Sequence, residues 1–182
     1  MKFDPKRHHR RSIRLQKYDY AQPGGYYVTI VTFQRDLLFG EIVNEEMNLK
    51  DHGRVVDECW CAIPEHFPNL ELGMYVVMPN HVHGIIVIRA GDISSARRGT
   101  IYRAPTEKFG KPVIGSIPTI IRTFKASVTR RLGREFNVTN IWQRNYYEHV
   151  IRDQEDWERI HDYIESNPAM WENDEENPTK QA

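Results

Sequence analysis

Residues 70–88, "LELGMYVVMPNHVHGIIVI", are the strongest indicator of the fold in this sequence. Two apolar runs rich in β-branched residues flank Pro79 and Asn80, a pair that is typical of a tight turn. Strands that are joined so closely must pair antiparallel, so this stretch predicts a β-hairpin. Because side chains alternate along a strand, His81 and His83 lie on the same face. Two imidazoles at the head of an apolar strand need an explanation.

The segments around this hairpin complete a small α+β domain. Hydrophobic periodicity predicts strands at residues 26–34 and 140–151, and helices at residues 49–67, 117–133 and 154–168. Pro64 ends or kinks the first helix, and Gly133 ends the second. The order is β-α-β-β-α-β plus one more helix, which is the ferredoxin-like arrangement of a four-stranded antiparallel sheet with two helices on one face. The other face is open to a ligand or to the last helix.

Length and composition indicate one domain with extensions. The chain has 182 residues, of which 40% are hydrophobic, and no apolar run approaches the ~20 residues needed to cross a bilayer. We expect a basic N-terminal arm (residues 1–25), a single domain (26–170) with a long loop (90–116), and a loose acidic tail (171–182). No apolar signal segment follows the basic N-terminus, so a cytoplasmic protein without membrane association is expected.

Charge is unevenly distributed in a chain whose net charge is zero. Residues 1–25 carry seven Lys or Arg against two acids, residues 97–134 carry ten against one, and residues 153–182 carry two against ten. Such blocks form a local basic surface that suits nucleic acid, or they are solvated surface. Composition leaves these two alternatives about equal.

The paired histidines are the best candidate for a metal site. Two imidazoles on one strand face can reach the same ion, although a satisfied histidine near a turn is the ordinary alternative for each. A third ligand is needed, and the last helix offers one, because Tyr163 and Asn167 are i and i+4 and share a face. The amide oxygen of Asn167 suits a hard cation. The structural alternative is a core tyrosine followed by a helix stop before Pro168.

The segments "VVMPNHVHGIIVI" and "IWQRNYYEHVIRDQEDWERIHDYIESNPAMW" resemble the single-tyrosine HUH transposases, named for a His-hydrophobic-His motif. The chain more closely resembles the REP-associated tyrosine transposases, and the resemblance covers about residues 5 to 171. It implies that Tyr163 is the catalytic nucleophile and that Asn167, one turn later, is the third metal ligand beside His81 and His83. Tyr146 and Tyr147 are the rival nucleophiles.

The resemblance implies a metal-dependent transesterification on single-stranded DNA. Tyr163 would form a 5′-phosphotyrosine, with Mg²⁺ or Mn²⁺ bound weakly until substrate oxygens complete its shell. The implied substrate is a hairpin formed by a REP-like palindrome, and the protein would be a monomer or a homodimer. Tyr18 or Tyr20 could stack on bases. The candidate phosphate contacts are Arg7, Arg10, Arg11 and Arg14 in the arm and Arg122, Lys125, Arg130 and Arg131 in the second helix.

Two alternatives remain open from the sequence. The first is a hairpin-binding module of the same fold without catalysis, although the third strand lacks the aromatic motif of RNA-recognition domains. The second is a metal-dependent phosphodiesterase that uses water as the nucleophile. Such a site recruits further ligands, and His149 and Asp162 are the obvious donors.

Overall fold

The computed structural model describes residues 18–90 and 113–181. The arm residues Arg7, Arg10, Arg11 and Arg14 and most of loop 90–116 lie outside this range. The sheet and helices are, in chain order, β1 (Gly24–Val31), β2 (Gly40–Val43), β3 (Glu46–Leu49), α1 (Asp51–Cys61), α2 (Ile63–His66), β4 (Leu70–Val77), β5 (His81–Ile88), α3 (Ile117–Phe136), β6 (Tyr147–Ile151) and α4 (Gln154–Ser166). Three short 3₁₀ turns are η1 (Phe33–Arg35), η2 (Trp171–Asn173) and η3 (Pro178–Gln181).

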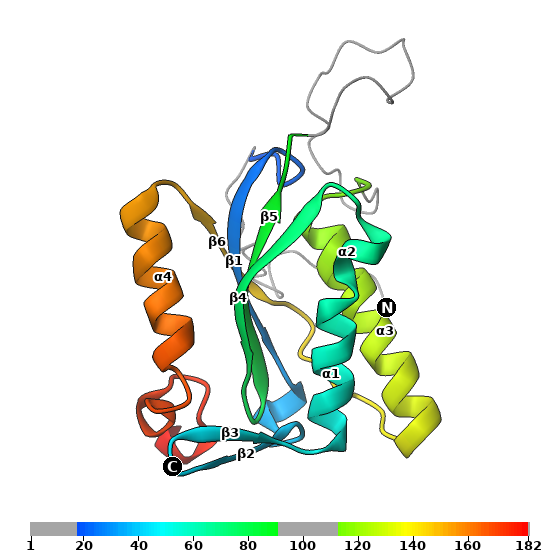
Figure 1. Ribbon diagram of the computed structural model, residues 1–182. Coiled ribbons are helices and arrows are strands. Elements are labelled where there is room, and N and C mark those ends of the chain that lie inside the picture. The colour runs from blue at the N-terminus through cyan, green and yellow to red at the C-terminus, as the bar shows by residue number, and fades with distance from the viewer. Residues whose placement is uncertain (1–17, 91–112, 182) are drawn as a thin grey trace, which may run out of the picture.

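The central sheet has the predicted ferredoxin-like topology. Its four strands lie in the order β4-β5-β1-β6, and every neighbouring pair is antiparallel. The hairpin of β4 and β5 forms as expected, and β1 lies between β5 and β6 (Figure 1). The α+β fold class is therefore confirmed.

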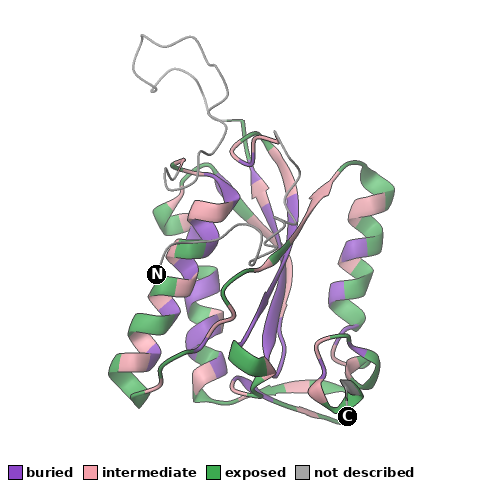
Figure 2. Ribbon diagram, turned by 180° about the vertical axis from the view of Figure 1, so that it is seen from behind, coloured by how far each residue is buried: buried purple, intermediate pink, exposed green. Residues whose placement is uncertain are grey.

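Helices cover both faces of this sheet, as Figure 1 shows: α1 and α3 lie on one side and α4 on the other. The larger core lies beneath α1 and α3, and Figure 2 shows the inward faces of these helices as buried. Gly84 on β5 allows this packing, because a Cβ at this position would lie 2.3 Å from the ring of Trp60. A smaller core, which includes Ile85, Ile160 and Ile164, attaches α4 to the other face. The face that carries His81 and His83 is thus the face of α4.

Three local features differ from the sequence-based expectation. The β2–β3 hairpin was not predicted, and Asn44 and Glu45 adopt positive φ at its turn. Helix α3 continues past Gly133 and ends at Asn137, which takes the left-handed conformation. Strand β6 is shorter than residues 140–151, because the preceding residues form only an isolated bridge between Thr32 and Trp142.

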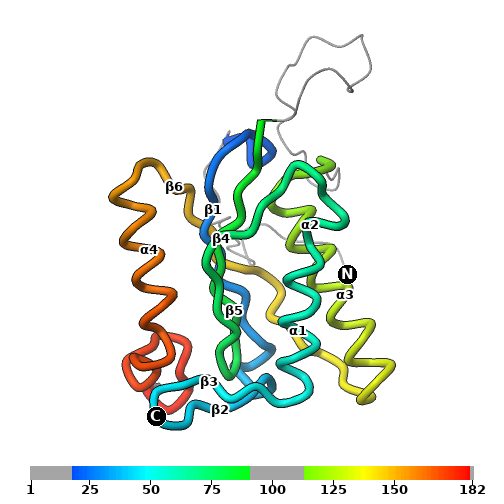
Figure 3. Tube along the Cα trace, in the orientation of Figure 1, coloured from blue at the N-terminus to red at the C-terminus, as the bar shows by residue number. Residues whose placement is uncertain are grey.

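Both ends of the described chain contribute to the packed structure. Tyr20 is 6% exposed and belongs to the main core, so the expected basic arm of residues 1–25 is too long at its C-terminal end, and base stacking by Tyr20 is wrong. The C-terminal residues 171–181 fold back beneath α4 beside the turn between β4 and β5 (Figure 3). Within residues 18–90 and 113–181, no helix is both long and apolar enough to cross a membrane.

Candidate functional site

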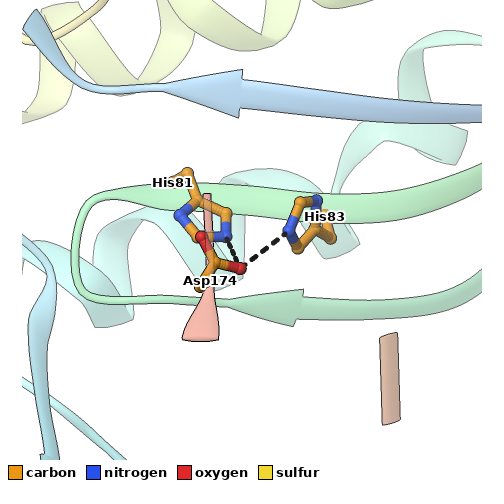
Figure 4. A group of neighbouring side chains, drawn as sticks. All are labelled: His81, His83 and Asp174. Carbon is orange, nitrogen blue, oxygen red and sulfur yellow. Dashed lines mark ion pairs between the residues drawn. The ribbon is translucent and has the colours of Figure 1, made fainter. Parts of the chain in front are cut away.

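His81 and His83 stand at the start of β5 and are buried, with ring centroids 4.3 Å apart. Figure 4 shows both rings beside the carboxylate of Asp174, whose Oδ2 lies 3.9 Å from the Nε2 atom of each histidine. Two donors that each lie about 2.1 Å from one ion can be up to ~4.2 Å apart. Each histidine can therefore share one cation with Asp174, and the donor atoms of all three lie within 4.8 Å of one another.

Asn80 determines which nitrogen of His81 faces this centre. Its Nδ2 donates to the carbonyl oxygens of Arg35 (3.2 Å) and Glu176 (2.8 Å), which leaves its Oδ1 as an acceptor. That oxygen lies 2.8 Å from Nδ1 of His81, so Nδ1 carries the proton. Nε2 of His81 keeps its lone pair, is buried and has no hydrogen-bond partner among the described residues. A histidine held through its other nitrogen in this way is typical of metal ligands.

Two hydroxyl groups orient the ring of His83 through its Nδ1 atom, as Asn80 orients the ring of His81. Nδ1 of His83 lies 2.7 Å from the hydroxyl of Tyr27 and 3.0 Å from Oγ1 of Thr29. Both residues project from β1, where Thr29 pairs directly with His83 in the sheet register. When Nδ1 donates to these oxygens, Nε2 of His83 is left for a cation. Neither Asn80 nor this hydroxyl pair was identified from the sequence.

Asp174 was missed because the C-terminal segment was expected to be loose, and that expectation is wrong. Asp174 and Asn177 are only 6% and 4% exposed, and Glu176 forms an ion pair with Arg35 at 2.7 Å. Burial alone would raise the pKa of Asp174, but its interactions with His83 and His81 hold that pKa well below its usual range. A carboxylate therefore faces the two imidazoles at neutral pH.

Tyr163 brings a phenol to the same centre from α4. Its hydroxyl lies 3.4 Å from Nε2 of His83, and the residue is 43% exposed, so a substrate can reach it. Burial and then the charge of Asp174 raise the pKa of Tyr163 to about 12, while hydrogen bonds with Asn167 and Tyr27 act in the opposite direction. The phenol is thus protonated at neutral pH, and its use as a nucleophile requires removal of that proton.

Asn167 follows Tyr163 by one helical turn and caps α4. Its Nδ2 donates to Oδ2 of Asp174 at 3.0 Å, and its buried Oδ1 has no hydrogen-bond partner within the described part of the chain. Oδ1 of Asn167 and Nε2 of His81 are thus two buried, unpaired acceptors beside one carboxylate, an arrangement that costs stability unless a ligand satisfies them.

Burial lowers the pKa of His81 and of His83, so both imidazoles are neutral and available to a cation. The residues present fit a divalent cation.

A cleft of about 560 Å³ opens beside this centre, between β6 and α4. Tyr163 and Tyr147 both line it, and Tyr147 is 51% exposed. Tyr146 instead packs against the main core on the opposite side of the sheet. Of the two rival tyrosines, only Tyr147 shares the cleft with Tyr163.

The two extra metal donors considered from the sequence do not join the histidine pair. Nε2 of His149 lies 2.7 Å from Oδ2 of Asp156, which ties β6 to α4. The side chain of Asp162 is 82% exposed on α4. The carboxylate beside the histidines comes from Asp174 in their place.

The four cationic candidates belong to α3, which lies on the face of the sheet opposite to α4 (Figure 1), whereas the cleft lies beside α4. Nζ of Lys125 donates to the carbonyl oxygens of residues 143 and 145, both at 2.8 Å, and burial lowers its pKa to about 8. Arg131 forms ion pairs with Glu58 and Glu135. Arg122 and Arg130 are exposed. Lys125 and Arg131 thus have close internal partners, whereas Arg122 and Arg130 are exposed and Arg122 donates only a long hydrogen bond, 3.4 Å, to Oγ1 of Thr119.

The ferredoxin-like sheet, the His-hydrophobic-His strand and the tyrosine helix beside it agree with the resemblance to the single-tyrosine HUH transposases. No family model matches the sequence. The chain is 42% identical over 168 residues to an uncharacterized protein of Haemophilus influenzae. The matched region covers 92% of this chain and 93% of that protein. It is 25% identical over 151 residues to a protein of the same species named "Putative REP-associated tyrosine transposase". Here the matched region covers 83% of this chain and 73% of that protein. In sequence the chain is thus similar to a protein named as a REP-associated tyrosine transposase, and it is related more strongly to the uncharacterized protein.

A solved structure agrees with the fold. The structure of a REP-associated tyrosine transposase bound to a REP hairpin has a TM-score of 0.60 and 22% sequence identity. The likeness covers 88% of this chain and 74% of that chain. At this identity the likeness shows a shared architecture, and the roles of individual residues need the geometry described above.

Proposed function

We propose that the protein nicks and joins single-stranded DNA, as a transposase does, with Tyr163 as the nucleophile and a divalent cation as cofactor. The observation that carries the proposal is the position of the Tyr163 hydroxyl. It lies 3.4 Å from Nε2 of His83, in a centre where Nε2 of His81 and Oδ1 of Asn167 are buried and have no hydrogen-bond partner among the described residues. Relatives named as transposases support the same class of activity. Tyr163 is also half-exposed in the cleft, as a nucleophile for a macromolecular substrate must be.

Four side chains would hold the cation, and all four are buried. His81 and His83 would bind through Nε2, Asn167 through Oδ1, and Asp174 through a carboxylate oxygen. Mixed nitrogen and oxygen donors suit Mn²⁺, and Mg²⁺ is the alternative. When bound, the cation supplies Lewis-acid polarisation of the phosphate oxygens.

The residues of the chain perform the bond exchange. The oxygen of Tyr163 loses its proton and attacks a backbone phosphorus, and a tyrosine–phosphate bond forms as the bond to the 3′-oxygen breaks. The 3′-oxygen takes up a proton and leaves as a hydroxyl, while the 5′-phosphate stays on Tyr163. Because the new bond is a phosphodiester, a second 3′-hydroxyl can reverse the step and join another strand. Hydrolysis by water would lose that option.

We infer that the substrate is a DNA hairpin with a single-stranded flank. The relative of similar fold was solved with a REP hairpin, and this chain has basic blocks in its arm and on α3. Arg122 and Arg130 on α3 and the arginines at positions 7, 10, 11 and 14 are the proposed phosphate contacts. The internal contacts of Lys125 and Arg131 make these two residues weaker candidates.

The test incubates the protein with a labelled hairpin that carries single-stranded flanks, in the presence of Mn²⁺, followed by a denaturing gel. Wild type should give a labelled covalent adduct, and Tyr163→Phe should give none while it still binds the hairpin. Tyr147→Phe is the matched control and should retain the adduct. An adduct with Tyr163→Phe that disappears with Tyr147→Phe would assign the nucleophile to Tyr147.

One observation favours a second candidate, a phosphodiesterase that uses water. Asp174 adds a carboxylate to the two histidines, and His-His-carboxylate sets also occur in metal-dependent hydrolases. The same gel separates the candidates, since this activity would give free 5′-phosphate ends without an adduct. Hairpin binding with neither product would indicate a module without catalysis.

A further inference from the structure

The part of the cleft nearest β6 has no role in the centre described above. We propose that it binds one nucleotide of the single strand next to the scissile phosphate, with the base stacked on Tyr147 and the adjoining phosphate on Arg159. The proposal rests on the proposed function and adds a binding subsite to it.

The sheet register places Tyr147 in line with the centre. Thr29 on β1 pairs with His83 on one side and with Tyr147 on the other, so these three residues form one row across the sheet. Neighbouring strands lie ~4.8 Å apart, which puts Tyr147 roughly 10 Å from the backbone of His83. A strand whose phosphate lies at the centre would reach Tyr147 with its next nucleotide.

The ring of Tyr147 is available to a ligand. Tyr147 is 51% exposed, and β6 pairs only with β1 in the described structure, so the ring lies at the open edge of the sheet. Its other side meets the ring of Tyr27 edge-on, with centroids 6.2 Å apart, which supports the ring. Ile160 adds an apolar contribution to the lining of the cleft. A half-exposed aromatic ring in a concave site is a platform on which any base can stack.

Charge places the phosphate on one side of this subsite. Arg159 and His149 both contact the carboxylate of Asp156, which holds the two side chains at the cleft. The side chain of Arg159 is 68% exposed, and a guanidinium has five donors, so most of them remain for a phosphate. Glu175 and Glu176 line the same cleft and repel a phosphate. The backbone of a bound strand should therefore follow Arg159.

The test measures DNA binding without cleavage. A short oligothymidylate with 2-aminopurine at one position is titrated with the full-length protein in EDTA, and the position is varied between oligonucleotides. Stacking on an aromatic ring quenches 2-aminopurine fluorescence. Loss of one stacked base should weaken binding by about 5- to 150-fold in Tyr147→Ala. Tyr147→Phe should bind within about twofold of wild type, because stacking needs the ring and not the hydroxyl.

Two further variants complete the design. Arg159→Ala should weaken binding and reduce its salt dependence, since no guanidinium then neutralises the phosphate. Phe136→Ala removes an aromatic residue of similar exposure, 38%, at the end of α3 and should bind as wild type. Thermal melting of each variant confirms that it is folded.

Three results would overturn the proposal: wild-type affinity in Tyr147→Ala, equal losses in Tyr147→Ala and Tyr147→Phe, or no quenching at any position of the probe. Because the experiment uses neither metal nor Tyr163, its failure differs from failure of the proposed function. If the wild-type protein formed no adduct with Mn²⁺, the proposed activity would be refuted. If Tyr147→Ala nevertheless bound DNA more weakly than wild type, the proposed subsite would stand.

Discussion

Removal of the hydroxyls that hold His83 should weaken metal binding in two separable steps. Nδ1 of His83 has two neighbours, the Tyr27 hydroxyl at 2.7 Å and Thr29 Oγ1 at 3.0 Å. Tyr27→Phe and Thr29→Val each remove one hydroxyl with little change in volume. Both residues are buried, so water does not readily replace the lost oxygen. The double variant leaves Nδ1 without either partner.

The expected magnitudes follow from this redundancy. Loss of the group that orients a ligating histidine costs 10- to 100-fold in metal affinity. Either single variant retains one acceptor for Nδ1, so each should lose no more than about 10-fold in metal affinity. The double variant should lose about 100-fold in metal affinity, which corresponds to ~2.8 kcal/mol of binding free energy. His81 has one such acceptor, Oδ1 of Asn80, so Asn80→Ala alone should match the double variant.

The assay is an electron paramagnetic resonance titration of free Mn²⁺, which needs no DNA and no catalysis. Thermal melting without metal separates a loss of fold from a loss of ligand orientation. Wild-type affinity in the double variant would refute the reasoning. So would a full loss in Tyr27→Phe with no effect of Thr29→Val, because the two hydroxyls would then not share one role.

Three other predictions concern the centre and its substrate. Asn167→Ala should reduce cleavage less than His81→Ala, and only the former should recover at high Mn²⁺, because imidazole is the stronger donor; equal responses across a Mn²⁺ titration would contradict this order. Asp174→Asn should lower Mn²⁺ affinity by at least about 10-fold in the same titration, because loss of the one anionic ligand should cost no less than loss of an orienting group, and an unchanged value would remove Asp174 from the ligand set. Deletion of residues 1–17 should lower the log–log salt slope of hairpin binding by about 0.7–0.9 for each phosphate that the arm neutralises, and an unchanged slope would show that the arm does not touch DNA.

The parts of the fold that were predictable are those in which one face is apolar. The hairpin of β4 and β5 and the helix α4 carry periodic apolar residues, and their predicted limits agree closely with the structure. The β2–β3 hairpin escaped prediction because its turn uses Asn44 and Glu45 at positive φ without a glycine. The composition of residues 140–146 favours a strand, yet the local chain there does not pair continuously.

The candidate site was predictable to the extent that its residues share one element. His81 and His83 share a strand face, and Tyr163 and Asn167 share a helix, so spacing alone brought each pair together. Asp174 joins them only because the chain reverses after α4, and a single acid in an acidic segment carries no signal of that reversal. Asn80 did stand beside His81 in the sequence, but a turn residue before a strand is the more ordinary interpretation.

Asp174 changes the electrostatics expected of the centre. Three neutral ligands would leave the full +2 charge of the cation to the phosphate and would hold the ion weakly before DNA binds. A carboxylate beside His81 and His83 would reduce the net charge of the bound cation and its ligands to +1 and would strengthen the hold on the free ion. The pull on the phosphate is then smaller, and a cationic contact within the cleft, such as Arg159, becomes more important for holding the strand in place. On this argument, Mn²⁺ should bind measurably without DNA, and the Asp174→Asn variant should depend more strongly on DNA to retain it.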